Sequence, residues 1–129
     1  MIVLDASAAF ELVSQTPLAR EIETRLGDEI PPHAPHLLDL EVASSLRRHC
    51  ALGACSPERA RQALLDLSGI PLIRHPHYPL LPRIWELREN FTAYDACYLA
   101  LAEALNATLL TRDGALASAR LRQGKIEVI

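Results

Sequence analysis

Four acidic residues of this sequence lie among apolar neighbours: Asp5, Glu41, Asp95 and Asp113. A carboxylate in such company is costly unless it is paired, hydrogen-bonded or bound to a metal. Four carboxylates held close together would repel one another and take up protons unless a cation lay between them. Oxygen-only ligand sets suit Mg²⁺ or Mn²⁺, which can activate water and neutralise charge on a phosphodiester. The four residues therefore predict metal-dependent chemistry on a phosphodiester.

Two of these acids are placed by strands. Asp5 ends the apolar run 2–4, and Asp113 lies two residues beyond the run 108–111. Both runs are typical of buried strands. Ligands of open parallel α/β sheets bind outside the carboxyl ends of strands, where the strand order reverses. Both aspartates therefore lie where a site is expected.

The other two acids are placed by helices. Asp95 opens the least polar predicted helix, 92–106, and shares a face with residues that should be packed. Glu41 lies in a predicted helix over 37–52, with leucines three and four residues before it. Both carboxylates are therefore expected to be partly buried.

Each acid also has a purely structural explanation. Asp5 and Asp113 could cap the helices that follow them. Thr92 and Asp95 match a capping box, and Glu41 could reach water from the edge of its helix. Any one of these explanations is reasonable alone. Together they require all four acids to be incidental, which favours a shared site.

The remaining pattern alternates helices with strands, as in α/β proteins with a parallel sheet covered on both faces. Proline, glycine and capping signals divide the chain into short elements. The expected helices cover 7–16, 17–27, 37–52, 57–69, 81–87, 92–106 and 115–119. The expected strands cover 2–4, 71–74, 108–111 and 126–129, and the proline-rich loop 30–35 could hold another.

Composition indicates one folded domain over residues 1–129. The chain is 50% hydrophobic and 22% charged, which excludes wholesale disorder. No apolar run approaches the roughly 18 residues of a membrane span, and no secretory signal is predicted, so we expect a cytoplasmic protein with no membrane partner. Three cysteines, Cys50, Cys55 and Cys97, favour reduced thiols over a disulfide framework. Net charge is −3, but the rest is mildly basic once the four acids are set aside, which suits a polyanionic substrate.

Four segments in this order resemble motifs of the PIN-domain ribonucleases, specifically the VapC-type toxins of toxin–antitoxin systems. They are Val3-Leu-Asp5-Ala-Ser7-Ala, Leu37-Leu-Asp-Leu-Glu41-Val-Ala-Ser-Ser-Leu-Arg47-Arg48, Thr92-Ala-Tyr-Asp95-Ala-Cys-Tyr-Leu-Ala-Leu-Ala102 and Thr108-Leu-Leu-Thr111-Arg-Asp113. The resemblance implies a three-layer α/β/α sandwich with a mainly parallel sheet. It also implies metal-dependent endonucleolytic cleavage of RNA, homodimerisation and neutralisation by a cognate antitoxin.

Carried over residue by residue, the resemblance makes the four acids a quartet that binds one or two Mg²⁺ or Mn²⁺ ions. Asp5, Asp95 and Asp113 would be the nearest ligands. Glu41 would bind directly, bind through water, or help to deprotonate the attacking water, and the 3′ oxygen of the RNA would leave. The pattern after Glu41 selects it over Asp39.

Five further residues have expected roles beside the quartet. Ser7 and Thr111 would support the site through hydrogen bonds. Arg112, Arg47 and Arg48 are candidate phosphate contacts, against the alternative that they are solvated arginines.

The sequence departs from the family pattern at one position, and other functions compete with the nuclease. Ser44 stands where many relatives have Asn. A serine does not offer the amide group that would support the site at this position. A catalytically inactive PIN-like module that binds RNA or protein is the main alternative, and intact acids count against it. A phosphoacceptor domain would need a second acid beside the first, but Ala6 follows Asp5 here. The histidines and cysteines lack the spacing of a zinc site. Trp85 is expected in the core or in a dimer contact.

Overall fold

The computed structural model describes residues 1–27 and 30–129. Its centre is a parallel sheet in the order β3-β2-β1-β4-β5. The strands are β1 (Ile2–Leu4), β2 (His33–Pro35), β3 (Ile73–His75), β4 (Thr108–Thr111) and β5 (Lys125–Val128). The helices are α1 (Ala6–Val13), α2 (Ala19–Leu26), α3 (Leu37–Ala51), α4 (Pro57–Gly69), α5 (Leu81–Glu86) and α6 (Ala93–Leu105), with 3₁₀ turns η1 (Tyr78–Leu80) and η2 (Gly114–Ser118).

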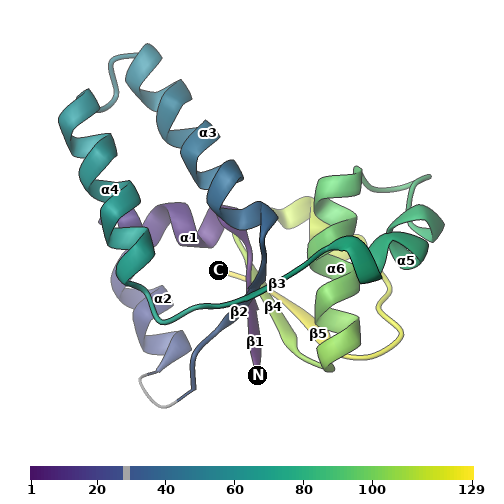
Figure 1. The fold of residues 1–129 in the computed structure, drawn as a ribbon. Helices are drawn as coiled ribbons and strands as arrows, with labels where there is room; N and C mark the ends of the chain where they lie inside the picture. Colours follow the sequence, from purple (N-terminus) through teal and green to yellow (C-terminus); the bar gives the residue numbers. More distant parts are fainter. Residues whose placement is uncertain (28–29) are drawn as a thin grey trace.

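The elements form three layers, as expected for an α/β/α sandwich. Figure 1 shows α1 to α4 on one side of the sheet and α5 and α6 on the other. The hairpin of α3 and α4 extends well away from the sheet. The chain builds β1, β2 and β3 in one direction, then returns to place β4 on the opposite side of β1. The strand order therefore reverses between β1 and β4, where a ligand site of such a sheet is expected.

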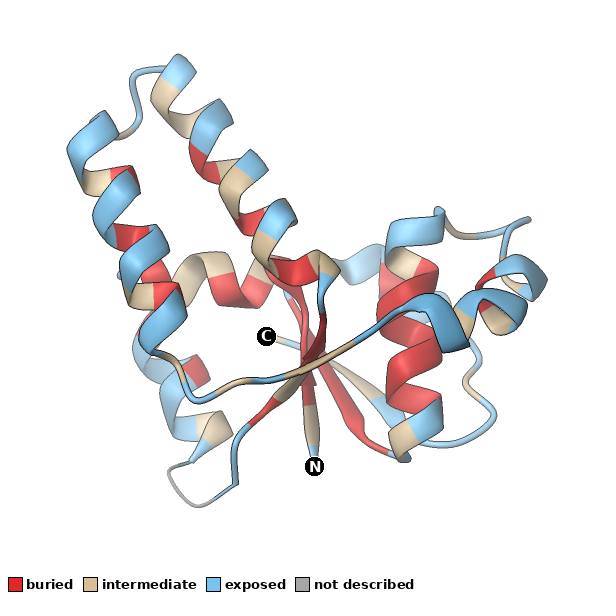
Figure 2. Cartoon of the chain, in the orientation of Figure 1, coloured by how far each residue is buried: buried red, intermediate tan, exposed pale blue. Residues whose placement is uncertain are grey.

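The core lies on both faces of β1 and β4. Val3, Leu4, Leu109 and Leu110 are fully buried in the middle of the sheet. Helix α6 is the most enclosed helix, and Figure 2 shows burial along nearly its whole length. A strand or helix that is surrounded on all sides has an apolar residue at nearly every position. The sequences of β1, β4 and α6 therefore lack an amphipathic pattern.

Helix ends follow the capping chemistry of the sequence. The Ser56 hydroxyl accepts a hydrogen bond from Arg59 N at 3.1 Å, and Pro57 occupies the first turn of α4. The Thr92 hydroxyl accepts from Asp95 N at 3.2 Å at the start of α6. Gly27 ends α2 with a φ of 68°, a backbone conformation that glycine adopts easily.

Four expected elements differ from the structure in type or by two or more residues at one end. α1 ends at Val13, three residues before the expected end of that helix. β3 begins at Ile73, two residues late, because Ile73 is the residue that pairs with His33 of β2. α2 begins at Ala19 rather than Pro17. The expected helix near 115–119 is the 3₁₀ turn η2, which is too short to complete α-helical hydrogen bonding.

Trp85 is not in the core. Its exposed fraction is 67%, and the Arg88 guanidinium lies 4.6 Å from the centre of the indole ring. In α5 it is Ile84 that faces α6, so Trp85 points to the surface. Within the described ranges, no helix has both the length and the apolar character needed to cross a membrane.

Candidate functional site

The four acids converge on one pocket at the carboxyl end of the sheet. Asp5, Glu41, Asp95 and Asp113 all line a pocket of about 530 Å³. Asp5 follows β1, Asp113 follows β4, Asp95 lies in the first turn of α6, and Glu41 in the second turn of α3. The pocket therefore lies beside the point where the strand order reverses.

Asp5 is the most tightly held of the four. Its side chain is buried, and Oδ1 accepts a hydrogen bond from Ala6 N at 2.8 Å. Oδ2 accepts from Ser7 Oγ at 2.5 Å and from Thr111 Oγ1 at 2.6 Å. The Thr111 hydroxyl also accepts from Asp113 N at 2.9 Å. The Ser7 hydroxyl of α1 and the Thr111 hydroxyl of β4 thus hold the Asp5 carboxylate, and Thr111 also binds the backbone of Asp113.

Glu41 is held across the pocket by a buried tyrosine. Tyr98 Oη donates to Glu41 Oε2 at 2.5 Å, and the tyrosine side chain is almost fully buried in α6. Burial raises the pKa of Glu41, the hydrogen bond from Tyr98 lowers it, and repulsion from Asp5 and Asp95 raises it further. Sequence reasoning did not identify Tyr98, although its position three residues after Asp95 places it one helical turn further along the same face.

The pKa of Asp95 is raised by the same two causes as that of Glu41. Burial raises its pKa, its hydrogen bond with Thr92 opposes that effect, and repulsion from Asp113 and Asp5 adds to the rise. Asp113 is exposed, and its Oδ1 accepts from Ala115 N at 2.8 Å. The carboxylates are therefore near enough to resist being ionised together.

The capping explanations and the shared pocket are both correct. Asp5 caps α1, Asp113 caps η2, and Thr92 caps α6 next to Asp95. A cap uses one carboxylate oxygen of Asp113, so its second oxygen remains available to a ligand. A capping role in these residues is therefore compatible with a place in the shared pocket.

The neighbouring acid Asp39 lies outside the pocket. Its two oxygens accept from Arg74 Nε at 2.7 Å and Arg74 Nη2 at 2.9 Å. Glu41, two residues along the same helix, lines the pocket instead. The geometry thus separates the two acids as the sequence pattern did.

The three candidate arginines have different surroundings. Arg48 lines the pocket, and its Nη2 donates to Ser45 Oγ at 3.0 Å. Arg112 forms an ion pair with Glu11, and neither Arg112 nor Arg47 lines the pocket. Only Arg48 therefore stands where it could contact a phosphate at the acids without moving.

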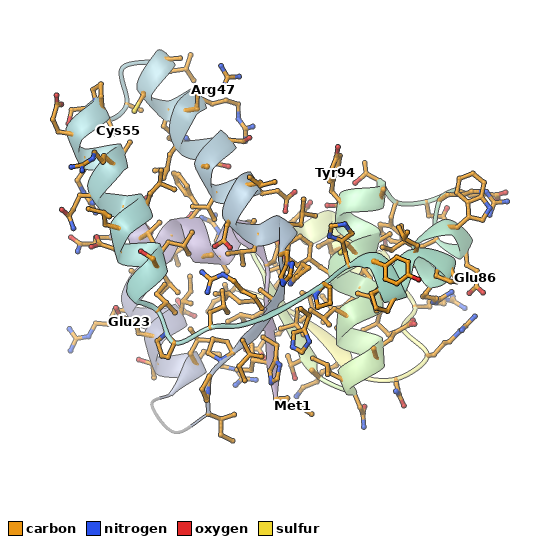
Figure 3. All side chains as sticks on the ribbon, viewed as in Figure 1. Met1, Glu23, Arg47, Cys55, Glu86 and Tyr94 are labelled. Carbon is orange, nitrogen blue, oxygen red and sulfur yellow. The ribbon has the colours of Figure 1, made fainter. Side chains whose placement is uncertain are left out.

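The rest of the lining includes residues that the sequence did not single out. Leu40 of α3 and Tyr94 of α6 are exposed and line the pocket, and Figure 3 shows Tyr94 projecting from the start of α6. Ser44, at the position where many relatives have Asn, also lines the pocket. The acids therefore lie below a rim that carries apolar and hydroxyl groups.

The donor set fits a hard divalent cation. All four groups offer oxygen, and within the described residues no arginine, lysine or histidine lies within 4.0 Å of them as an ion-pair partner. No three acidic, histidine or cysteine side chains of the described chain are yet gathered closely enough to hold an ion. The carboxylates thus form an open pocket lining that a cation would draw together.

Comparisons with known proteins agree with this architecture. The model of the family described as PIN domain matches residues 2–120. The chain is 41% identical, over 131 aligned positions, to VapC ribonuclease Mb0985 of Mycobacterium bovis, covering 100% of this chain and 98% of that protein. It is 36% identical to Ribonuclease VapC12 of Mycobacterium tuberculosis, covering 100% and 99%. The solved structure of PAE2754 from Pyrobaculum aerophilum superposes with a TM-score of 0.69 at 24% identity, covering 97% and 82%.

Proposed function

The chain belongs to the PIN-domain family, and from this premise we propose that it is a Mg²⁺- or Mn²⁺-dependent endoribonuclease, the toxin of a type II toxin–antitoxin system. The observation that carries the proposal is the meeting of four carboxylates from β1, α3, α6 and the end of β4 in one pocket without an internal cation. Relatives named as ribonucleases cover the full chain and support the same activity.

The proposed roles follow from how each side chain is held. Asp5, Asp95 and Asp113 would hold the metal ion, which when bound neutralises phosphodiester charge and favours ionisation of water. Ser7 and Thr111 keep Asp5 in one orientation through hydrogen bonds to a single oxygen. A carboxylate fixed in this way loses little further freedom when it binds an ion.

Two more residues complete the proposed machinery on α3. Glu41 is the fourth acid of the pocket, and the Tyr98 hydroxyl keeps one of its oxygens directed toward α6. Arg48 lies in the pocket wall, where its guanidinium can donate to phosphate oxygens of the RNA. The α3 face thus supplies both an acidic and a basic group to the same substrate.

A matched pair of substitutions on α3 tests the nuclease. Purified protein is incubated with a mixed pool of structured RNAs, with Mn²⁺ or with EDTA, beside the variants Glu41→Gln and Asp39→Asn. We expect discrete cleavage by the wild type and by Asp39→Asn only with Mn²⁺, and strong loss in Glu41→Gln. Asp39 is the control because it lies on the same helix, pairs with Arg74 and stays outside the pocket.

Failure has distinct forms in this experiment. Cleavage that persists in EDTA contradicts metal dependence. RNA binding without cleavage, together with absent metal binding by calorimetry, favours the non-catalytic module.

The toxin role has its own test. Induced expression should arrest growth in the wild type but not in Glu41→Gln, and co-expression of the cognate antitoxin should relieve the arrest. A pocket of about 430 Å³ between α1, α2 and α4, whose lining includes Leu12, Leu26 and Ile70 beside Glu23 and Asp66, supports a protein partner on that side. Growth arrest that persists in Glu41→Gln would contradict toxicity through RNA cleavage.

We also propose a homodimer. Tyr78, Leu81 and Trp85 are exposed large side chains within one short segment, η1 and α5. Such a group is unusual on a monomer surface and favours a contact between subunits. Light scattering of wild type and Trp85→Ala would detect the dimer and its weakening, and a monomeric wild type would contradict it.

A further inference from the structure

Two cysteines face each other at the far end of the α3–α4 hairpin. Cys50 lies in the last turn of α3 and Cys55 immediately before the Ser56 cap of α4. Their sulfur atoms are 3.3 Å apart, and both thiols are free. Figure 3 shows Cys55 at the hairpin end that is remote from the sheet. The pair is therefore separate from the acidic pocket.

The connection between the helices holds the sulfurs together. Gly53 has a φ of 74° and its N–H donates to Cys50 O at 3.0 Å. Ala54 N donates to His49 O at 2.8 Å in the same turn. These bonds reverse the chain within a few residues and return Cys55 beside Cys50. The approach of the thiols is thus a property of the folded turn.

The third cysteine shows what an ordinary core thiol looks like here. Cys97 is 2% exposed in α6, and burial raises its pKa to about 11. A thiol of that kind reacts slowly because the thiolate is the reactive form. Cys50 and Cys55 are only half-buried, and residues 51–54 between them are exposed. Small reagents can therefore reach the pair but not Cys97.

The distance leaves little movement for a bond. A disulfide requires sulfurs about 2 Å apart, so the two atoms must approach by roughly 1.3 Å. Rotation about the cysteine side-chain bonds can supply such a shift, and Gly53 lets the turn adjust. The geometry of the fold is thus close to that of the bonded state.

We propose that Cys50 and Cys55 are a redox-active pair, oxidised to an intramolecular disulfide by exchange with low-molecular-weight disulfides such as oxidised glutathione. One protein thiolate attacks the small disulfide, forming a mixed disulfide and releasing one small thiolate. The second protein thiolate then attacks the protein sulfur of that mixed disulfide and releases the other small thiolate. The protein dithiol is oxidised, the small disulfide is reduced, and the two thiol protons pass to solvent or to the released thiolates.

The two thiols are hydrogen-bonded to each other, and either sulfur can be the donor. The contact with Cys55 raises the pKa of the Cys50 thiol, and burial adds to that effect. Either protein thiolate can make the first attack, and the other then resolves the mixed disulfide and closes the ring.

The bond would join the end of α3 to the start of α4. Arg48, which lines the acidic pocket, lies two residues before Cys50 on the same helix. The pair thus restrains the end of the helix that carries the pocket's arginine. The expected structural effect is a hairpin end that opens less often, with slower proteolysis in 51–54.

Thiol counting in glutathione buffers tests the proposal on the full-length protein. Protein is equilibrated at graded ratios of oxidised to reduced glutathione, quenched in acid, unfolded, and labelled with a maleimide. We expect two of the three thiols to escape labelling, a mass before labelling that is lower by two hydrogen atoms, and a linked peptide containing Cys50 and Cys55. The same titration in urea measures the contribution of the fold, and we expect the native pair to oxidise at a ratio on the order of tenfold lower.

Three variants separate this outcome from others. Cys97→Ser should behave as the wild type, whereas Cys50→Ser should stop at a glutathione adduct on Cys55. Cys55→Ser should stop at the corresponding adduct on Cys50. Stable adducts on both cysteines of the wild type, a disulfide that involves Cys97 or a second molecule, or equal ratios in native and urea-unfolded protein would each overturn the proposal.

Discussion

Helix α6 carries an acidic residue near each end, and the two acids are treated in opposite ways. Glu103, near its carboxyl end, is 6% exposed, and its oxygens accept from Arg83 Nε and Nη2, both at 2.8 Å. Arg122 N adds a third hydrogen bond at 3.0 Å. Hydrogen bonds from Arg83 lower the pKa of Glu103, whereas burial raises the pKa of Asp95.

The two ends of α6 differ in the source of the positive charge that neutralises the carboxylate. At Glu103 the protein supplies it, so ionisation and folding support each other. At Asp95 the neighbours are two other carboxylates, Asp5 and Asp113, so ionisation opposes folding until a cation arrives. A partly buried acid with an internal partner indicates structure, whereas one with only acidic neighbours indicates a site for a cation from solution.

The largest expected effect is on activity at the Asp95 end. Asp95→Asn should lower the rate of RNA cleavage by at least about 100-fold, because loss of a mere outer-shell partner already costs up to that much at metal sites. Its free energy of unfolding in EDTA should equal or exceed that of the wild type, because the substitution relieves repulsion. Gel-based cleavage rates and urea unfolding measure the two quantities. Near wild-type cleavage would remove Asp95 from the proposed ligand set.

Binding of Mn²⁺ should distinguish the two ends next. At a free concentration of 100 times the dissociation constant, an ion that binds only the folded protein stabilises it by about 2.7 kcal/mol. We expect that gain in the wild type and in Glu103→Gln, and a much smaller gain in Asp95→Asn. Thermal unfolding with and without Mn²⁺ measures the gain. An equal gain in Asp95→Asn would place the ion elsewhere.

The Glu103 end should respond in stability instead. Glu103→Gln should lower the free energy of unfolding by about 2 kcal/mol, since it breaks a nearly buried charged pair while Arg83 retains Glu86. Glu127→Gln is the matched control, because its two-point pair with Arg25 lies at the surface and should cost under about 1 kcal/mol. Urea unfolding in EDTA measures both losses. Equal losses would show that burial does not distinguish the two pairs.

The smallest expected effect is the pH dependence of stability in EDTA. Because the pKa of Asp95 is raised on folding, its stabilising contribution is present below the unfolded pKa and is lost as pH rises through the folded pKa. The stability advantage of Asp95→Asn should therefore grow with pH from about 4 upward, and stay under about 1 kcal/mol.

Glu103 should show the opposite sign. Its lowered folded pKa gives a contribution that is present above the unfolded pKa and is lost as pH falls through the folded value. The deficit of Glu103→Gln should shrink on acidification. Urea midpoints at a series of pH values measure both trends, and parallel trends in the two variants would contradict the comparison.

Much of the fold could be predicted because local signals agreed with tertiary packing. The run Thr108–Thr111 is a strand with the expected bounds. Its four residues are all buried, and the left-handed Asn106 that ends α6 lies just before it. Ser56 and Pro57 gave the start of α4 for the same reason. The bounds of β3 could not be predicted, because pairing with β2 sets them and that pairing is not local.

The site was predictable in its residue types and less so in their partners. Carboxylates after strands and on apolar helix faces are visible as sequence, and the structure brings all four to one pocket. The Tyr98 bond to Glu41 spans 57 positions, and the Arg112 pair with Glu11 spans 101, so neither could be read from spacing. Contacts across the sheet depend on register, which a single sequence does not reveal.

The pairing of β1 with β4 has a consequence for the order of events during synthesis. Asp5 emerges from the ribosome 106 residues before Thr111, whose hydroxyl fixes it, and also before the carboxylate of Asp113. A nascent chain therefore carries an incomplete pocket until β4 and Asp113 have been made. If the pocket cleaves RNA as proposed, the chain stays inactive on the ribosome until β4 folds against β1.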